Sequence, residues 1–373
     1  MTEKELISLR EGLRSPIGYV LRLLRQPGRY VRSFFFHPYE TLFGFKIPVQ
    51  SLPAPRDSEA ALVSEAAPEQ EIQSLPENVE MSAQTEIKQT WPDLSRWPWR
   101  PLGQLVPAKM PGGKPWPRIS IVTPSYQQGE YIEQTIRSVL MQGYPNLEYI
   151  VIDGGSTDFT QTVLRRYSSE LDVCISEADE GQADAINKGF RYSTGEILAW
   201  LNSDDMHLPT TLIEVALAFE MAEALNPTRP VDLVCGRALL YSEKEGTIFH
   251  EHRSKFPRGI SQLPLEINDF DLWEKSAAFF YQPEVFFTRR VWNEIGGGLN
   301  PFLHYALDYD LWIRMAKREI YLYSTDACLA IFRFHEKQKT KHGDLVVHPE
   351  HQAVSVFHRE NPAPEASYLP EKI

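Results

Sequence analysis

The middle of the chain alternates short apolar runs with stretches of helical periodicity. The apolar runs and the periodic segments that follow them lie at 119–122 and 131–140, 147–152 and 160–167, 172–175 and 182–190, and 197–202 and about 209–225. Apolar runs of this length predict buried strands, and apolar residues at a spacing of three to four predict helices. Strands that alternate with helices in this way predict an α/β fold built on a parallel sheet.

Beyond residue 225 the pattern is less regular. It predicts a strand at 231–241, an irregular stretch to about 275, a strand at 283–287, a helix at 289–296 and a strand-like run at 321–334. The residues from about 344 onward are polar and include prolines, so 344–373 is predicted to be a C-terminal tail.

The N-terminal segment, residues 1–48, combines arginines with apolar residues and ends in the aromatic run Phe34, Phe35 and Phe36. Basic amphipathic segments of this kind lie in a membrane interface beside anionic lipid. The alternative is a pair of helices docked on the rest of the protein or on a partner.

Residues 49–115 are rich in proline, serine, alanine and acidic side chains. Such a segment buries too little apolar surface to offset its ordering entropy, so it is interpreted as an acidic linker. Its later tryptophans, Trp91, Trp97 and Trp99, are expected to pack onto the domain that follows.

Composition excludes several classes of protein. With 42% hydrophobic residues the chain is globular, and a net charge of −12 argues against a nucleic-acid binder. Cys174, Cys235 and Cys328 are odd in number and far apart, which favours buried, reduced thiols and a cytosolic compartment. No apolar run reaches the roughly 18 residues of a transmembrane helix, and the N-terminus does not read as a secretory signal. We therefore expect a cytoplasmic protein with peripheral contact to a membrane.

Polar clusters follow four of the predicted strands. They are Thr123 to Tyr126, Asp153 to Asp158, Asp179 to Lys188 and Asn202 to Asp205. Because the carboxyl ends of parallel strands meet at one edge of a sheet, we expect these clusters to converge on a pocket.

The chemistry of two clusters can be bounded from their residue types. The adjacent carboxylates Asp204 and Asp205 suit a hard cation such as Mg²⁺ or Mn²⁺; the alternative is that Asp205 caps the next helix. The Gly154-Gly155-Ser156 turn offers backbone N–H groups to an anion or a ribose, and it is equally an ordinary turn.

Several motifs together carry a resemblance. The run SIVTPSYQQGEYIEQTIRSVLMQGYPNLEYIVIDGGSTDFT, then DEGQADAINKGF, GEILAWLNSDD and GGLNPFLHYALDYDLWIRM, resembles the family 2 glycosyltransferases of the GT-A fold, a group rich in bacterial cell-surface polysaccharide enzymes. The resemblance covers about 118–335. It implies a catalytic domain at 116–343 with a mixed sheet flanked by helices, which binds a nucleotide-sugar donor.

The resemblance places nucleotide-sugar binding on all four clusters, with the Tyr126 ring and Asp153 near the base. The implied residues are Thr123, Pro124, Ser125, Tyr126, Asp153, Ser156, Asp179, Gln182, Asp184, Asn187, Lys188, Asn202, Ser203 and Asp204.

The chain departs from the family pattern at two positions. The first aspartate of the metal-binding D-x-D is Asn202 here, so Asp204 or Asp205 is expected to be the principal metal ligand, with the family's C-terminal Arg-x-His segment adding His335. The family's Glu-Asp pair near the acceptor falls on Leu307 and Asp308, so the glutamate is missing.

The remaining assignments concern the acceptor. Asp308 is expected to take the proton of the acceptor hydroxyl, with Asp310 as the reserve candidate; the alternative is that Asp308 caps the helix that follows. Arg333 and Lys339 are expected to reach the metal or the diphosphate with His335. Gln282 and Pro283 are expected on the acceptor side.

These assignments predict an inverting, metal-dependent glycosyltransferase that moves a sugar from a UDP-sugar to a glycan or lipid-linked acceptor. Nucleotidyl transfer is disfavoured, because TPSYQQGEY has one glycine and no lysine or arginine. A catalytically impaired nucleotide-sugar-binding or scaffold protein of the same fold is the alternative that Asn202 and Leu307 suggest.

Overall fold

The computed structural model describes residues 97–98, 106–271, 279–340 and 343–362. The predictions for 1–48, for most of 49–115 and for Trp91 and Trp99 lie outside these residues.

Most elements agree with the hydrophobic pattern. In chain order they are β1 (Ile119–Ser125), α5 (Ile132–Leu140), β2 (Leu147–Asp153), α6 (Thr160–Tyr167), β3 (Val173–Ser176), α7 (Gln182–Tyr192), β4 (Ile197–Trp200), β5 (Met206–His207), α8 (Thr211–Leu225), β6 (Leu233–Ser242), β7 (Thr247–Arg253), β8 (Gly259–Gln262), η1 (Leu265–Asn268), η2 (Gln282–Glu284), β9 (Val285–Thr288), α10 (Arg289–Glu294), α11 (Leu307–Lys317), β10 (Tyr321–Phe334) and α12 (Gly343–Glu360).

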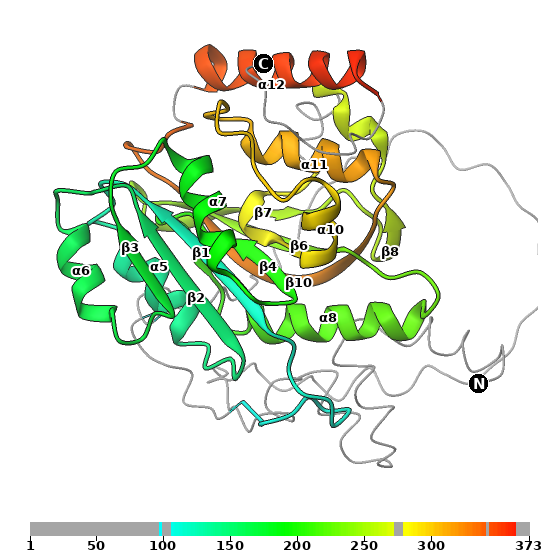
Figure 1. Cartoon of the computed structure of the whole chain (residues 1–373), viewed down its shortest axis with the longest axis horizontal. Helices are drawn as coiled ribbons and strands as arrows, with labels where there is room; N and C mark the ends of the chain where they lie inside the picture. The colour runs from blue at the N-terminus through cyan, green and yellow to red at the C-terminus, as the bar shows by residue number, and fades with distance from the viewer. Residues whose placement is uncertain (1–96, 99–105, 272–278, 341–342, 363–373) are drawn as a thin grey trace, which may run out of the picture.

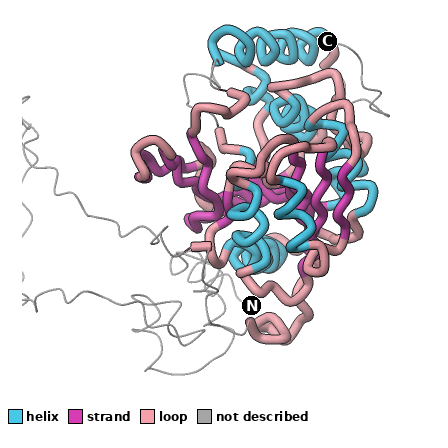
Figure 2. The backbone as a smooth tube through the Cα atoms, turned by 90° about the vertical axis from the view of Figure 1, so that its left-hand side faces the viewer, coloured by secondary structure: helices cyan, strands magenta, loops and turns pink. Residues whose placement is uncertain are grey.

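Ten strands of the described chain form one mixed sheet in the order β3-β2-β1-β4-β9-β6-β10-β5, with β7 on β6 and β8 on β10. The strands β3, β2, β1 and β4 are mutually parallel. β9 is antiparallel to both β4 and β6, so β6 and β10 run in the same direction as β1. Helices cover both faces (Figures 1 and 2), which confirms the predicted mixed α/β sheet flanked by helices.

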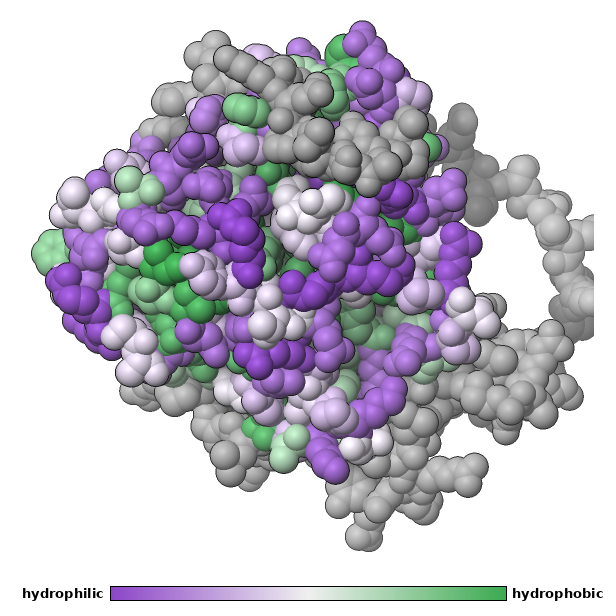
Figure 3. Space-filling view, viewed as in Figure 1, coloured by the Kyte–Doolittle hydropathy of each residue, from purple (hydrophilic) through white to green (hydrophobic). Residues whose placement is uncertain are grey.

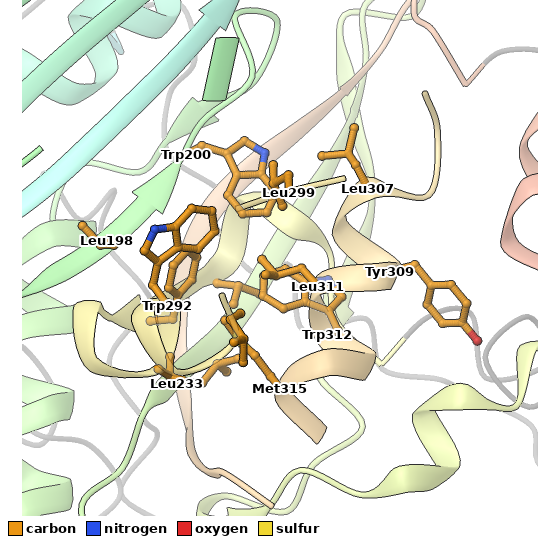
Figure 4. Close-up of a cluster of buried hydrophobic side chains, with 14 of the residues drawn as sticks. Leu198, Trp200, Leu233, Trp292, Leu299, Leu307, Tyr309, Leu311, Trp312 and Met315 are labelled. Carbon is orange, nitrogen blue, oxygen red and sulfur yellow. The ribbon is translucent and has the colours of Figure 1, made fainter. Parts of the chain in front are cut away.

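Alternate residues of the central strands supply the two halves of the core. In β4, Ile197 and Ala199 pack with α5, α6 and α8, whereas Leu198 and Trp200 pack with α7, α10 and α11. This follows from the two-residue period of a strand buried on both faces. Trp200 stacks on Trp312 of α11 with ring centroids 5.8 Å apart (Figure 4). Full burial of side chains of this size contributes on the order of 1.5–3 kcal/mol each, which fixes α11 against the end of β4.

α7 lies unusually close to the sheet. A Cβ on Gly189 would meet Val122 Cγ1 at 2.4 Å, so only glycine permits this approach of α7 to β1. The close packing brings the start of α7, at Gln182, to the carboxyl ends of β1 and β4.

The structure corrects two parts of the sequence reading. The stretch expected to be irregular contains β7 and β8, and β7 forms an antiparallel hairpin with β6. The predicted tail is wrong for residues 343–360, which form α12 across the top of Figure 1. Val354 and Ser355 of α12 are fully buried, so the helix belongs to the fold.

The expected packing of Trp97 is confirmed, because its indole nitrogen donates to the His207 carbonyl oxygen at 3.0 Å and its side chain is buried. Met110 and Trp116 pack into the core beside α5, so the last residues of the predicted linker belong to the domain. The cysteines are free, but Cys174 is exposed, which corrects the expected burial for that residue. Among the helices that the structure describes, none combines the length and the apolar content needed to cross a membrane.

Candidate functional site

A pocket of about 830 Å³ opens at the carboxyl ends of β1, β4 and β10. The side chains that line it belong to three walls. The first wall is the end of β1 together with the start of α7 and the loop before that helix. The second is the segment after β4 with the end of β10, and the third is the start of α11 with α12. All four polar clusters of the sequence therefore reach one cavity, the second of them only through Gly154, as the strand-end argument predicts.

The first wall contains Ser125 and Tyr126 at the end of β1 and Asp179 before α7. The Tyr126 ring is 61% exposed and free to meet a planar ligand, and Ser125 Oγ is buried without a hydrogen-bond partner among the described residues. Asp179 lies over Gly154, where a Cβ would meet Asp179 Oδ2 at 2.9 Å. Burial, with the nearby charge of Asp184, raises the pKa of Asp179. Unsatisfied polar groups beside an exposed ring suit a nucleotide.

A hydrogen-bonded chain of side chains crosses the pocket from this wall. Gln182 Nε2 donates to Asn202 Oδ1 at 2.8 Å, and Lys339 Nζ donates to Gln182 Oε1 at 3.0 Å. Pro124 and Ser203 also line the pocket. Asn202 thus accepts from the neutral amide of Gln182. The same amide accepts from Lys339 and so holds the ammonium group of Lys339 in the pocket.

Asp153 and Ser156 do not line the pocket in this structure, so the binding role that the sequence assigns to them stays a prediction. The Asp153 carboxylate is fully buried and accepts hydrogen bonds from Ser156 N and Oγ, at 2.9 and 2.5 Å. It also accepts from Ser176 Oγ at 2.6 Å and from Gln161 Nε2 at 2.9 Å. A carboxylate with these four donors fixes the loop after β2 and leaves little capacity for a ligand.

Four further residues assigned to the nucleotide sugar are held away from the cavity. Thr123 Oγ1 is 3.0 Å from the Tyr149 hydroxyl, and Asp184 accepts from Glu180 N at 3.3 Å. Asn187 exchanges hydrogen bonds with both backbone groups of Leu299, at 2.9 and 2.7 Å, and Lys188 pairs with Glu177. The structure uses these side chains to fix the loops around the pocket.

The second wall contains the adjacent carboxylates. Asp204 Oδ2 is 3.0 Å from His335 Nε2, and Asp205 Oδ1 accepts from the Arg333 backbone N–H at 2.9 Å. Burial, and then the charge of Asp204, raises the pKa of Asp205 well above its usual range. α8 begins at Thr211 without a side-chain cap, so the alternative role of Asp205 as its cap is not realised.

These side chains can be tested for metal binding. Within the described ranges, no three His, Cys, Asp or Glu side chains are grouped as a complete metal site. Asp204 and His335 do offer the oxygen and imidazole nitrogen that Mn²⁺ accepts, and Mg²⁺ or Mn²⁺ in such sites takes its other ligands from phosphate and water. The pair fits an ion that a bound diphosphate completes, and it distinguishes Asp204 from the more deeply buried Asp205.

The third wall contains Asp308 in the first turn of α11. Its Oδ1 accepts from the Tyr309 N–H at 2.8 Å, but the N-cap of α11 is Ala306, so Asp308 does not cap the helix, and its side chain reaches the pocket. Burial raises the pKa of Asp308, and the charges of His351 and Lys339 oppose that shift. A carboxylate whose pKa lies above its usual range is closer to the pKa that a general base needs near neutral pH.

The structure gives less support to Asp310, the reserve candidate for the base. It is fully buried outside the pocket lining, with Oδ2 2.9 Å from Arg314 Nε and Oδ1 2.8 Å from His358 Nε2. Burial would raise the pKa of Asp310, but Arg314 and His358 outweigh it and lower the pKa. Asp310 is a structural ion-pair partner.

On the remaining rim, Gln282 lines the pocket and its Nε2 donates to the Trp200 carbonyl oxygen at 2.8 Å, whereas Pro283 does not line it. The sequence reading missed His351 and Tyr305, which also line the pocket. His351 lies in the segment taken for a tail, and the acidic and histidine residues around it gave no periodic signal strong enough to reveal its helix.

Part of the chain is similar to proteins of a known family. Residues 120–294 match the family model described as glycosyl transferase family 2. An uncharacterized glycosyltransferase of Rickettsia typhi is 27% identical over 60% of this chain and 66% of its own length. The putative teichuronic acid biosynthesis glycosyltransferase TuaG of Bacillus subtilis is 40% identical over 24% of this chain and 36% of its own. The chain thus spans slightly less than two thirds of the first relative and about a third of the second.

Solved structures with a similar arrangement include S. aureus TarS 1-349 in complex with UDP and the mannosyltransferase PcManGT from Pyrobaculum calidifontis in complex with GDP-Man and Mn²⁺. The first has a TM-score of 0.47 and 17% identity over 64% of this chain and 65% of that chain. The second has a TM-score of 0.45 and 19% identity over 68% of this chain and 69% of that chain.

Proposed function

Because residues 120–294 match the model of glycosyl transferase family 2, we propose that the chain transfers a sugar from a nucleotide-sugar donor, a UDP-sugar by preference, to a hydroxyl of a glycan or lipid-linked acceptor, with inversion. The observation that carries the proposal is that Ser125, Tyr126, Asp204 and Asp308 line one pocket. The relative TuaG is named for teichuronic acid biosynthesis, which supports a role in a cell-surface polysaccharide.

The donor is proposed to bind along the first two walls. The Tyr126 ring meets the base, Ser125 Oγ and Asp179 bind the nucleoside, and the Asn202 amide accepts a ribose hydroxyl. Lys339 lies where the diphosphate would cross between the walls, and its charge offsets the negative charge that develops on the leaving group. A divalent ion held by Asp204 and His335 would supply Lewis-acid stabilisation of the same diphosphate.

The acceptor is proposed to approach from the α11 side. Asp308 takes the proton from the acceptor hydroxyl as its oxygen attacks the anomeric carbon, and the bond from that carbon to the diphosphate breaks. Attack from the face opposite the leaving group inverts the configuration in one displacement. Trp200, stacked on Trp312, forms an apolar floor that excludes water from this region.

A panel of UDP-, GDP- and dTDP-sugars, each with Mn²⁺ or with EDTA, tests the function. We expect release of nucleoside diphosphate from one donor with Mn²⁺, and a fall on the order of 10²–10³-fold with EDTA or in Asp204→Ala. Glu223→Ala, an exposed carboxylate on α8, is the matched control and should match the wild type. Release from no donor, with lipid-linked and glycan acceptors present, would favour the alternative of a non-catalytic nucleotide-sugar-binding or scaffold protein; full transfer in EDTA would remove the metal role.

A second proposal concerns the membrane and rests on the composition of residues 1–48. We expect the full chain to float with vesicles that contain anionic lipid, and a chain starting at Trp97 to remain in solution, because the arginines and Phe34 to Phe36 supply charge and apolar area. The catalytic domain face in Figure 3 is largely hydrophilic, with hydrophobic residues in small separate groups. Equal flotation of the two chains would show that the N-terminal segment does not bind membrane.

A further inference from the structure

α12 forms hydrogen bonds with the residues at the start of α11, the helix that carries Asp308. Glu350 Oε1 accepts from His304 N at 2.9 Å, and Glu350 Oε2 accepts from Tyr305 N and, at 2.6 Å, from Ala306 N. A carboxylate at these backbone N–H groups caps the start of α11 and interacts favourably with its dipole. The position of Asp308 therefore depends on α12, a segment outside the region that matches the family model.

A second contact between α12 and α11 lies two turns further along α12. His358 Nε2 is 2.8 Å from Asp310 Oδ1, and His358 Nδ1 is 2.8 Å from Lys317 Nζ. His358 and Asp310 are both buried. These two sets of contacts fix the position of α12 relative to α11.

His351 follows the capping glutamate directly. Its ring packs against Tyr309 of α11, with centroids 5.0 Å apart, and against Phe270, with centroids 5.7 Å apart. His351 and Asp308 line the same pocket, and no other histidine of α12 among the described side chains does so. The imidazole therefore packs beside the first turn of α11 and lines the same pocket as the Asp308 carboxylate.

The charges around Asp308 come from three elements. His351 and Glu350 belong to α12, Lys339 follows β10, and the Tyr309 N–H belongs to α11 itself. Of the two cations, the charge of His351 has the larger effect in lowering the pKa of Asp308 against its burial. Geometry and charge therefore indicate the same neighbour.

We propose that His351 is a positioning residue that pairs with Asp308: the charge of its ring and its fixed place beside α11 orient the Asp308 carboxylate toward the acceptor. This rests on the proposed glycosyl transfer. The acceptor O–H proton passes to Asp308, while the acceptor oxygen bonds to the anomeric carbon and the bonding pair of the broken C–O bond leaves with the diphosphate. The Asp308 carboxyl then releases the proton to water, which restores the carboxylate for the next turnover.

Two substitutions separate this role from packing. His351→Phe keeps a ring against Tyr309 and Phe270 without a nitrogen, and His351→Gln keeps polarity without an imidazole. We expect both to lower kcat about 10–100-fold with an unchanged Kd for nucleoside diphosphate. Both should also move the acidic limb of the kcat profile to higher pH, because the cation that favours ionised Asp308 is gone.

The control is His348→Gln, one turn earlier on α12, whose ring also packs on Phe270 but lies outside the pocket lining. Wild-type kcat and pH profile in His351→Phe would overturn the pairing.

An activity-free measurement keeps the pairing separate from the proposed function. The carboxyl carbon of Asp308 is identified by NMR as the signal lost in Asp308→Asn, and its titration is compared between the wild type and His351→Gln. Because the charge of His351 opposes protonation of Asp308, we expect the pKa of Asp308 to rise when the imidazole is removed. An unchanged titration would overturn the pairing even in an active enzyme. A coupled titration in a chain that uses no donor would support the pairing and count against glycosyl transfer.

Discussion

Asp308→Asn is expected to lower kcat for sugar transfer by roughly 10²–10⁴-fold and to leave the Kd for nucleoside diphosphate unchanged. Asparagine keeps the shape of the side chain and an oxygen that accepts from the Tyr309 N–H, so the first turn of α11 should stay in place. The amide oxygen cannot take the acceptor proton. Steady-state transfer assays and calorimetry of donor binding make the comparison.

The pH dependence of kcat is a second test of Asp308 as the general base. A general base works only when ionised, so kcat should fall as the pH drops through the pKa of Asp308. Because burial raises that pKa, the acidic limb should lie above the value of about 4 of an ordinary aspartate. Loss of donor binding in Asp308→Asn would instead assign the residue a structural role in the first turn of α11. Glu294→Gln, a half-exposed carboxylate on α10, is the control: its kcat should match the wild type.

The parallel half of the fold and the position of its pocket were predictable because they depend on local patterns. Short apolar runs and helical periodicity fix β1, β2 and β4 with their crossover helices, and parallel strands bring their carboxyl ends to one edge. β7 was missed because it lies on the edge of the sheet and is half exposed, so its alternation of apolar and polar residues is weak. α12 was missed because Pro349 and a largely polar face hide its periodicity.

The roles of individual polar residues were less predictable, because tertiary partners decide them. Asp308 and Asp310 both lie in the first turn of α11, yet only Asp308 reaches the pocket. Asp153 ends β2, where a ligand contact was expected, but neighbouring donors surround its carboxylate. A sequence shows which residues reach an edge of the sheet. It does not show which of their polar groups already form hydrogen bonds with neighbouring side chains.

Asn202, the departure from the family's D-x-D, has a physical reason in this site. It lies beside Asp204 and Asp205, and the pKa of Asp205 is already well raised by burial and by its neighbour. A third carboxylate would add like-charge repulsion that a neutral amide avoids. The amide still accepts from Gln182, which keeps the chain of hydrogen bonds to Lys339 intact.

The second large effect concerns stability. Asp310→Asn is expected to lower the free energy of unfolding by about 3–5 kcal/mol, because it leaves two buried partners, Arg314 and His358, without their counter-charge. Arg314 also donates to the carbonyl oxygens of Ile295 and Gly298, at 3.0 and 2.8 Å, so it cannot move to solvent without breaking the loop before α11. Urea unfolding followed by far-UV circular dichroism measures the change.

The control and the pH dependence make this prediction specific. Glu294→Gln removes the carboxylate of another Arg–acid pair at i,i+4 spacing, but Arg290 and Glu294 are both nearly half exposed, so the expected change is below about 1 kcal/mol. The folded-state pKa of Asp310 is lowered, so its contribution is present above the unfolded value of about 3.9 and is lost as the pH falls through the folded value. Wild type should therefore lose stability more steeply than Asp310→Asn below about pH 4. Equal stability of the two proteins at pH 7 would mean that Arg314 and His358 find other partners, and that α12 is held by Glu350 and its apolar contacts alone.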